Sequence, residues 1–131
     1  HLIRHPARVI TSYGAKRDTI TGYDIGYTAQ AALFDKIGGL IIDSSDIRQA
    51  PEAMLKKLCV AIDLPFDPAM LSWPAGQRKD DGIWASHWYN AVHKSTGFAG
   101  AEGPLPTLTG DNLTLLENAL PIYEKLAAHK I

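Results

Sequence analysis

The sequence predicts an α/β fold that is rich in helix and contains a parallel sheet. Two short apolar runs with strand character lie around residues 1–4 and 40–44, each followed by charged or polar residues. The segment between them carries two helical patterns, at about residues 6–17 and 24–37. Because strands joined by a helical crossover run parallel in one sheet, we expect a parallel pair. With 131 residues, the chain is long enough for one domain but not for two.

The first helix is expected to begin at Pro6, because proline has the fixed φ of a first helical turn. Val9, Ile10 and Tyr13 then recur at helical spacing. The second helical pattern has an apolar face, which suits a helix that crosses over a sheet. This face consists of Ala29, Ala32, Leu33 and Ile37.

Beyond the second strand, the sequence predicts a polar turn and then a helix that begins at Pro51. The apolar stripe of this helix consists of Met54, Leu55, Leu58, Cys59 and Ile62. Residues Ala99–Pro106 are rich in glycine and proline and are expected to form a loop or short linker. A last helix follows, capped by Thr109 or Asp111, and Pro121 is expected to kink or divide it.

Arg4 and Ser12 are the most informative polar residues. Arg4 ends the first strand, and Ser12 lies about two turns into the following helix. In open α/β sheets, ligands bind at the carboxyl ends of the strands, and a fork-shaped, permanently charged guanidinium suits phosphate. The pair therefore indicates a phosphate site. The alternative is structural, since an arginine before an amphipathic helix is common and Ser12 can bond to a carbonyl in the preceding turn.

The pattern R-x-P-x-x-V-x-x-S, formed by Arg4, Pro6, Val9 and Ser12, resembles a known element of sulfotransferases. That family uses it to hold the 3′-phosphate of the donor PAPS (3′-phosphoadenosine 5′-phosphosulfate). A second segment, residues 40–65, resembles the family in its order of strand, turn and helix. Because Ser44 and Ser45 replace the family's tyrosine and acid, this resemblance implies no catalytic residue.

In a third segment, Arg78, Lys79, Gly82 and Trp84 resemble the late sulfotransferase motif R-K-G-x-x-G-x-W. In the family this basic loop folds back over the donor and adds cations to its 3′-phosphate. Asp80 stands where the family has glycine, and an acid beside a phosphate is unfavourable unless it points away. The alternative is a solvated, charged turn. The resemblance implies four donor-binding residues, namely Arg4, Ser12, Arg78 and Lys79.

The segment from His87 to Phe98 is similar to a bacterial branch of sulfotransferase-like proteins. His87 and His93 are weak candidates for the base that deprotonates the acceptor, a role that requires reach to its hydroxyl. Their separation of six residues does not place them on one helical face, so we expect no metal. Both are better explained as structural histidines, bonded by a neighbouring carbonyl and packed on Trp84 or Trp88.

Charge and composition limit the classes of partner. A net charge of −1 gives no general attraction to nucleic acid or to an anionic membrane, so we expect neither. No apolar run approaches the roughly 20 residues of a membrane span, and the first residues form no signal peptide. The single cysteine, Cys59, suits a reducing compartment. We expect a cytoplasmic protein with a small-molecule acceptor, and the sequence indicates no oligomeric state.

The resemblance implies a three-layer, P-loop NTPase-like domain of which residues 1–131 form a carboxyl-terminal portion. Two strands are too few for its sheet, and the sequence lacks the glycine-lysine loop with which the family holds the 5′-phosphosulfate. The implied function is transfer of a sulfuryl group from PAPS to a hydroxyl or amine, with this portion inactive by itself. Two alternatives stay open, a non-catalytic nucleotide-binding or interaction module of the same fold and a P-loop kinase-like protein.

Overall fold

Two short strands run parallel at the centre of the molecule, as predicted. In the computed structural model, which describes residues 1–131, β1 (Leu2–Ile3) pairs with β2 (Ile42–Asp43). Ile3 lies opposite Asp43, so both strands end at the same edge of the sheet. The residues that follow at this edge, Arg4 and Ser44, continue from paired positions.

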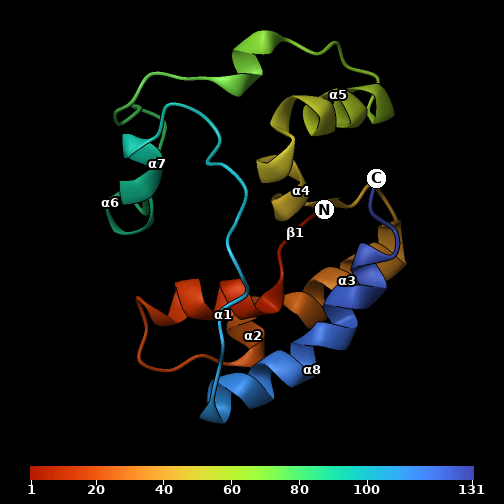
Figure 1. The fold of residues 1–131 in the computed structure, drawn as a ribbon, viewed down its shortest axis with the longest axis vertical. Coiled ribbons are helices and arrows are strands. Elements are labelled where there is room, and N and C mark those ends of the chain that lie inside the picture. Colours follow the sequence, from red (N-terminus) through yellow and green to blue (C-terminus); the bar gives the residue numbers. More distant parts are fainter.

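Eight α-helices and one 3₁₀ helix make up most of the remaining chain (Figure 1). They are α1 (Pro6–Gly14), α2 (Gly22–Ile25), α3 (Tyr27–Ile37), α4 (Ser44–Gln49), α5 (Pro51–Ala61), η1 (Pro68–Leu71), α6 (Ala85–Trp88), α7 (Asn90–Lys94) and α8 (Gly110–Ala127). α4 packs on α5, and α8 packs on α1, α3 and β1. None of the helices combines the length and the apolar character that a membrane span requires.

The core joins the first strand to the last helix. Its buried members are Ile3, Ala31, Ile41 and Leu126, with Phe34, Ile122, Tyr123 and Ala127 packed around them. The chain after α8 strengthens this connection, because Lys130 forms a bridge with Ile41 and the Ile131 amide donates to the Ile41 carbonyl at 3.0 Å. These contacts pack both strands against α8, so the carboxyl ends of the strands are held in a fixed position.

The second predicted helix is present, but it buries a different face from the one predicted. It is divided into α2 and α3 at Gly26, which has a φ of 70°. α3 buries Tyr27 and Ala31, whereas Leu33 and Ile37 are exposed. The Tyr27 hydroxyl donates to the Arg4 carbonyl and fixes this rotation. Because the helix is apolar on two sides, periodicity alone could not select the buried face.

Two other expectations need correction. The predicted polar turn after β2 is the helix α4, because Asp43 caps it by accepting a hydrogen bond from the Ser45 amide at 2.8 Å. Of the two effects expected of Pro121, a kink or a division, division does not occur, because α8 continues through it from Gly110 to Ala127. Buried Ala119 and Leu126, on either side of the proline, hold both halves of α8 against the rest of the molecule.

α6 and α7 form a small unit away from the strands, at the upper left of Figure 1. An antiparallel bridge between Ser72 and Gly97 closes the segment that carries them. The Trp88 ring of α6 stacks on Tyr13 of α1, with ring centroids 5.8 Å apart. The unit therefore contacts the carboxyl-terminal half of α1.

Candidate functional site

The candidate site lies at the carboxyl edge of the two strands. Arg4 directly follows β1, and α1 begins at Pro6 with His5 as its cap. α4 follows β2 in the same way, capped by Asp43. Two helices therefore begin at the edge where α/β sheets bind their ligands.

Three arginines surround one buried carboxylate at this edge. Oε1 of Glu102 lies 2.6 Å from Nη2 of Arg4 and 2.7 Å from Nη1 of Arg48. Oε2 lies 3.0 Å from Nε of Arg8 but receives no aligned hydrogen bond. The Glu102 side chain is 5% exposed, and those of Arg4, Arg8 and Arg48 are 37%, 16% and 30% exposed. We call these four residues the arginine cluster.

Glu102 is ionised because its neighbours outweigh its burial. Burial is the largest single influence on its pKa and favours the neutral acid. The hydrogen bond from Arg4 and the charges of Arg4, Arg8 and Arg48 act in the opposite sense, and together they lower the pKa of Glu102 below its ordinary value. Three guanidinium groups face one carboxylate, so the cluster retains a positive excess.

Glu102 belongs to residues 99–108, a segment that we call the strap. The strap crosses from the side of α7, past α1, to the start of α8 (Figure 1). Arg48 donates from Nε to the Gly100 carbonyl at 3.0 Å, and Arg8 donates to the Gly103 carbonyl. The loop predicted over Ala99–Pro106 is confirmed, but it is part of the site rather than a simple linker.

Further polar residues lie along the face of α1 that carries Arg8, at increasing distance from the arginine cluster. Ser12 is exposed and lies four residues beyond Arg8, so the two share this face. Four residues further on, just past the end of α1, Lys16 donates from Nζ to the His87 carbonyl at 2.6 Å. The same ammonium group lies 4.5 Å from the centre of the Trp88 ring. The strap thus lies at one end of this face and α6 at the other.

Arg78 and Lys79 form a second, separate group. Together with Asp81 and Gly82 they line a polar hollow that neither Arg4 nor Ser12 borders. The Arg78 guanidinium donates to the Pro74 carbonyl at 3.3 Å, and its backbone amide donates to Asp81 Oδ2 at 2.8 Å. The structure therefore groups Arg4 with Arg8 and Arg48, and Arg78 with Lys79.

The two histidines differ in their surroundings. His93 Nε2 lies 2.9 Å from Oδ2 of Asp81, so its partner is a carboxylate rather than the expected carbonyl. The hydrogen bond from the Arg78 amide is the main reason why the pKa of Asp81 is lowered. His87 is exposed and meets Trp88 edge-on, with centroids 4.9 Å apart, in agreement with the expected packing on tryptophan. No three His, Cys, Asp or Glu side chains come together as a possible metal site.

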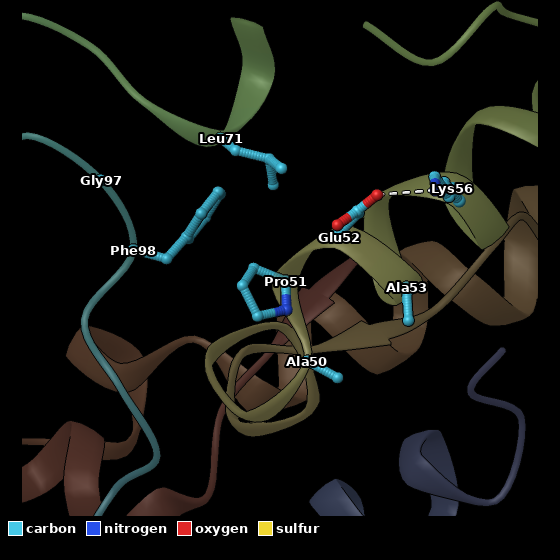
Figure 2. Close-up of a pocket in the computed structure, with 8 residues that line it drawn as sticks. All are labelled: Ala50, Pro51, Glu52, Ala53, Lys56, Leu71, Gly97 and Phe98. Carbon is cyan, nitrogen blue, oxygen red and sulfur yellow. Dashed lines mark hydrogen bonds and ion pairs between the residues drawn. The ribbon is translucent and has the colours of Figure 1, made fainter. Parts of the chain in front are cut away.

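An open hollow of about 680 Å³ lies between the start of α5 and the segment that precedes the strap (Figure 2). It is lined by Ala50, Pro51, Glu52, Ala53, Lys56, Leu71, Gly97 and Phe98. Its walls are close in sequence to Arg48 and Gly100, which are joined by the 3.0 Å hydrogen bond described above. Apart from the ion pair between Glu52 and Lys56, at 2.7 Å, its visible side chains are apolar.

Arg8, Arg48 and Glu102 were not predicted from the sequence as site residues. Spacing could have identified Arg8, because it lies four residues from both Arg4 and Ser12. Glu102 is the only charged residue between Phe98 and Gly110, which distinguishes it within the loop. Nothing in the sequence indicates its partners, because Arg4 and Arg48 lie 98 and 54 residues away along the chain.

Comparison with known proteins gives a family match over nearly the whole chain. The family model described as "Sulfotransferase domain" matches residues 1–130. Two Arabidopsis thaliana proteins, named branched-chain-amino-acid aminotransferase-like protein 2 and protein 1, are 33% and 32% identical to the chain over 133 aligned residues. Each alignment covers 98% of this chain but only 24% of the relative, so the chain spans about a quarter of their length. No solved structure matches the chain.

Proposed function

This chain belongs to the sulfotransferase domain family, and we propose on that basis that it takes part in sulfuryl transfer from PAPS to a hydroxyl or amine acceptor. Its specific contribution is recognition of the donor's 3′-phosphate. We further propose that the two parallel strands belong to a P-loop NTPase-like sheet. A cytoplasmic location is proposed with it, since buried Cys59 is the only cysteine and has no disulfide partner.

The observation that carries this proposal is the position of Arg4 relative to Ser12. The strand end presents a guanidinium at the carboxyl edge of the sheet, and the helix that follows presents an exposed hydroxyl on the same side as Arg8. Permanently charged, planar guanidinium groups can each form two parallel hydrogen bonds with a phosphate. Arg78 and Lys79 line a separate hollow in this structure, so their proposed contribution to the 3′-phosphate requires their loop to move toward Arg4.

The reaction requires positioning and charge stabilisation more than covalent chemistry by the protein. The acceptor oxygen or nitrogen forms a bond to sulfur while the bond from sulfur to the phosphate oxygen breaks, as in phosphoryl transfer. The acceptor proton passes to a base, for which His87 and His93 are the candidates in this chain. Adenosine 3′,5′-bisphosphate leaves, and cations at its 3′-phosphate hold it in line during the transfer.

The test is calorimetry on the full-length protein with adenosine 3′,5′-bisphosphate and with ADP. We expect the bisphosphate to bind and ADP to bind much more weakly, because ADP lacks the 3′-phosphate that Arg4 recognises. Arg4→Ala should weaken binding of the bisphosphate at least about tenfold, the loss expected for a charge-assisted hydrogen bond. Circular dichroism must show that the variant is folded. Equal affinity in the variant, or equal binding of ADP, would contradict the proposal.

We place the small-molecule acceptor in the hollow shown in Figure 2. Its apolar wall supports this choice, as does the short distance in sequence from Ala50 and Phe98 in its lining to Arg48 and Gly100, which are hydrogen-bonded to each other. Ala53→Phe adds a ring inside the hollow and should lower the rate of sulfuryl transfer to a panel of small alcohols and amines. Its affinity for adenosine 3′,5′-bisphosphate should stay unchanged, and Ala91→Phe on exposed α7 serves as the control. A transfer rate equal to that of the control variant would exclude this hollow as the acceptor site.

A second candidate function is a non-catalytic interaction module. The observation in its favour is that a carboxylate of the chain already occupies Arg4, as expected where such arginines have become structural. In that case neither adenosine 3′,5′-bisphosphate nor ADP would bind the full-length protein. The same calorimetric titrations therefore distinguish the two candidates.

A further inference from the structure

The arginine cluster has more positive charge and more hydrogen-bond donors than Glu102 can satisfy. The carboxylate offers two oxygens to three guanidinium groups, so Arg4 and Arg48 share Oε1. Oε2 is buried without an aligned hydrogen bond, although Arg8 Nε lies only 3.0 Å away. A phosphate or sulfate monoester has three terminal oxygens, one for each guanidinium, and a phosphate monoester carries nearly twice the charge of a carboxylate at neutral pH.

The position of the arginine cluster also favours a ligand-binding role over a role in stability alone. Arg4 follows β1, Arg8 lies in the first turn of α1, and Arg48 lies in the last turn of the helix that follows β2. Ser44 also follows β2 at this edge, and its buried hydroxyl has no hydrogen-bond partner. Burying polar atoms without partners is unfavourable, so the present arrangement leaves hydrogen-bonding capacity unused.

The strap that brings Glu102 to the cluster is weakly held. Its backbone makes no hydrogen bond to other backbone groups. Most of its residues are exposed, including Ala101 and Pro104 on either side of the Glu102–Gly103 pair. The hydrogen bonds that Arg48 and Arg8 donate to the Gly100 and Gly103 carbonyls involve the cluster itself. A ligand that occupies the guanidinium groups would therefore release the strap at the same time.

We propose that Arg4, Arg8 and Arg48 form one binding site for a phosphate- or sulfate-bearing ligand, and that Glu102 is an internal anion that this ligand displaces. The proposal rests on the proposed function for the identity of the ligand, the 3′-phosphate of a nucleotide. Arg8 and Arg48 are then binding residues in addition to Arg4. Displacement of Glu102 opens the strap beside the hollow, so that donor binding and access to the hollow become linked.

The experiment combines limited proteolysis with calorimetry on the full-length protein. Inorganic phosphate, adenosine 3′,5′-bisphosphate and ADP are each added at millimolar concentration, and cleavage within the strap by a broad-specificity protease is followed by mass spectrometry. We expect the bisphosphate to accelerate cleavage of the strap, because the strap is released from Arg8 and Arg48, while it slows hydrogen exchange in α1. Glu102→Gln should open the strap without ligand and bind the bisphosphate about tenfold more tightly, since no carboxylate competes. Glu117→Gln, at an exposed position of α8, should leave both quantities unchanged.

Each outcome shows whether a ligand displaces Glu102 or whether Glu102 stays permanently bound to the three arginines. If the bisphosphate binds without faster cleavage of the strap, or if Glu102→Gln binds no more tightly, Glu102 is not displaced. If neither phosphate nor the bisphosphate binds, the site does not exist. If phosphate or ADP opens the strap as well as the bisphosphate does, the anion site stands and the proposed 3′-nucleotide recognition fails. The wild-type measurement remains decisive should Glu102→Gln fail to fold.

Discussion

His5 connects the arginine cluster to the start of α1. Its Nδ1 accepts a hydrogen bond from the Ala7 amide at 3.2 Å, and its ring meets Tyr123 edge-on at 5.3 Å. Burial is the main cause of the lowered pKa of His5, and repulsion from Arg8 adds to it, against the opposing charges of Asp43 and Glu124. The imidazole is therefore neutral at pH 7, as its role as acceptor in the cap requires.

We predict that the stability contributed by His5 decreases in mild acid. Because its pKa is below the ordinary 6.5 in the folded protein, the unfolded chain binds more protons between the two values. The contribution is complete above 6.5 and is lost as the pH falls through the folded pKa. NMR titration of the imidazole should give a pKa below 6.5. His5→Asn keeps a capping group and should remove this pH dependence, and a curve unchanged by that substitution would contradict the role of His5.

At the scale of the elements, the turn between α2 and α3 depends on a backbone conformation that favours glycine. Gly26 has a φ of 70°, and a Cβ at this position would meet no atom within 4 Å. We predict that Gly26→Ala lowers the free energy of unfolding by about 1 kcal/mol through backbone strain alone. The melting temperature should fall by about 3–5 °C. Gly100→Ala, which also has open space but no positive φ, is the control and should not be destabilised.

Some features of the helices and strands could be predicted from the sequence, and others could not. The parallel strands and the starts of α1 and α5 at Pro6 and Pro51 follow from local patterns, and they were predicted correctly. The rotation of α3 was not, because it is set by the Tyr27 hydroxyl and the Arg4 carbonyl, 23 residues apart. Continuity of α8 through Pro121 depends likewise on distant packing of Leu126 on Ile3 and Ile41. Local propensity determines where elements begin, whereas tertiary contacts determine which face they bury.

At the scale of the whole molecule, Glu102 joins three segments that are distant in sequence. Arg4 lies after β1, Arg48 at the end of α4, and Glu102 on the strap before α8. Arg4 was predicted from the sequence as a phosphate-binding residue, but a carboxylate 98 residues away cannot be assigned to it from spacing. The composition of the loop, with its glycines and prolines, predicted only irregular backbone.

This connection predicts an acid-sensitive contribution to stability. Glu102 has a pKa below its ordinary value of 4.5 in the folded protein, so its contribution is complete above 4.5 and is lost as the pH falls through the folded value. Wild-type protein should lose unfolding free energy in this range, measured by urea denaturation from neutral pH to about pH 3. Glu102→Gln should be less stable at neutral pH by about 1–3 kcal/mol, because three partly exposed guanidinium groups lose their counter-charge. The difference between variant and wild type should shrink in acid, while Glu117→Gln should follow the wild-type curve. A difference that stays constant across the range would mean that the cluster does not hold Glu102 as a carboxylate.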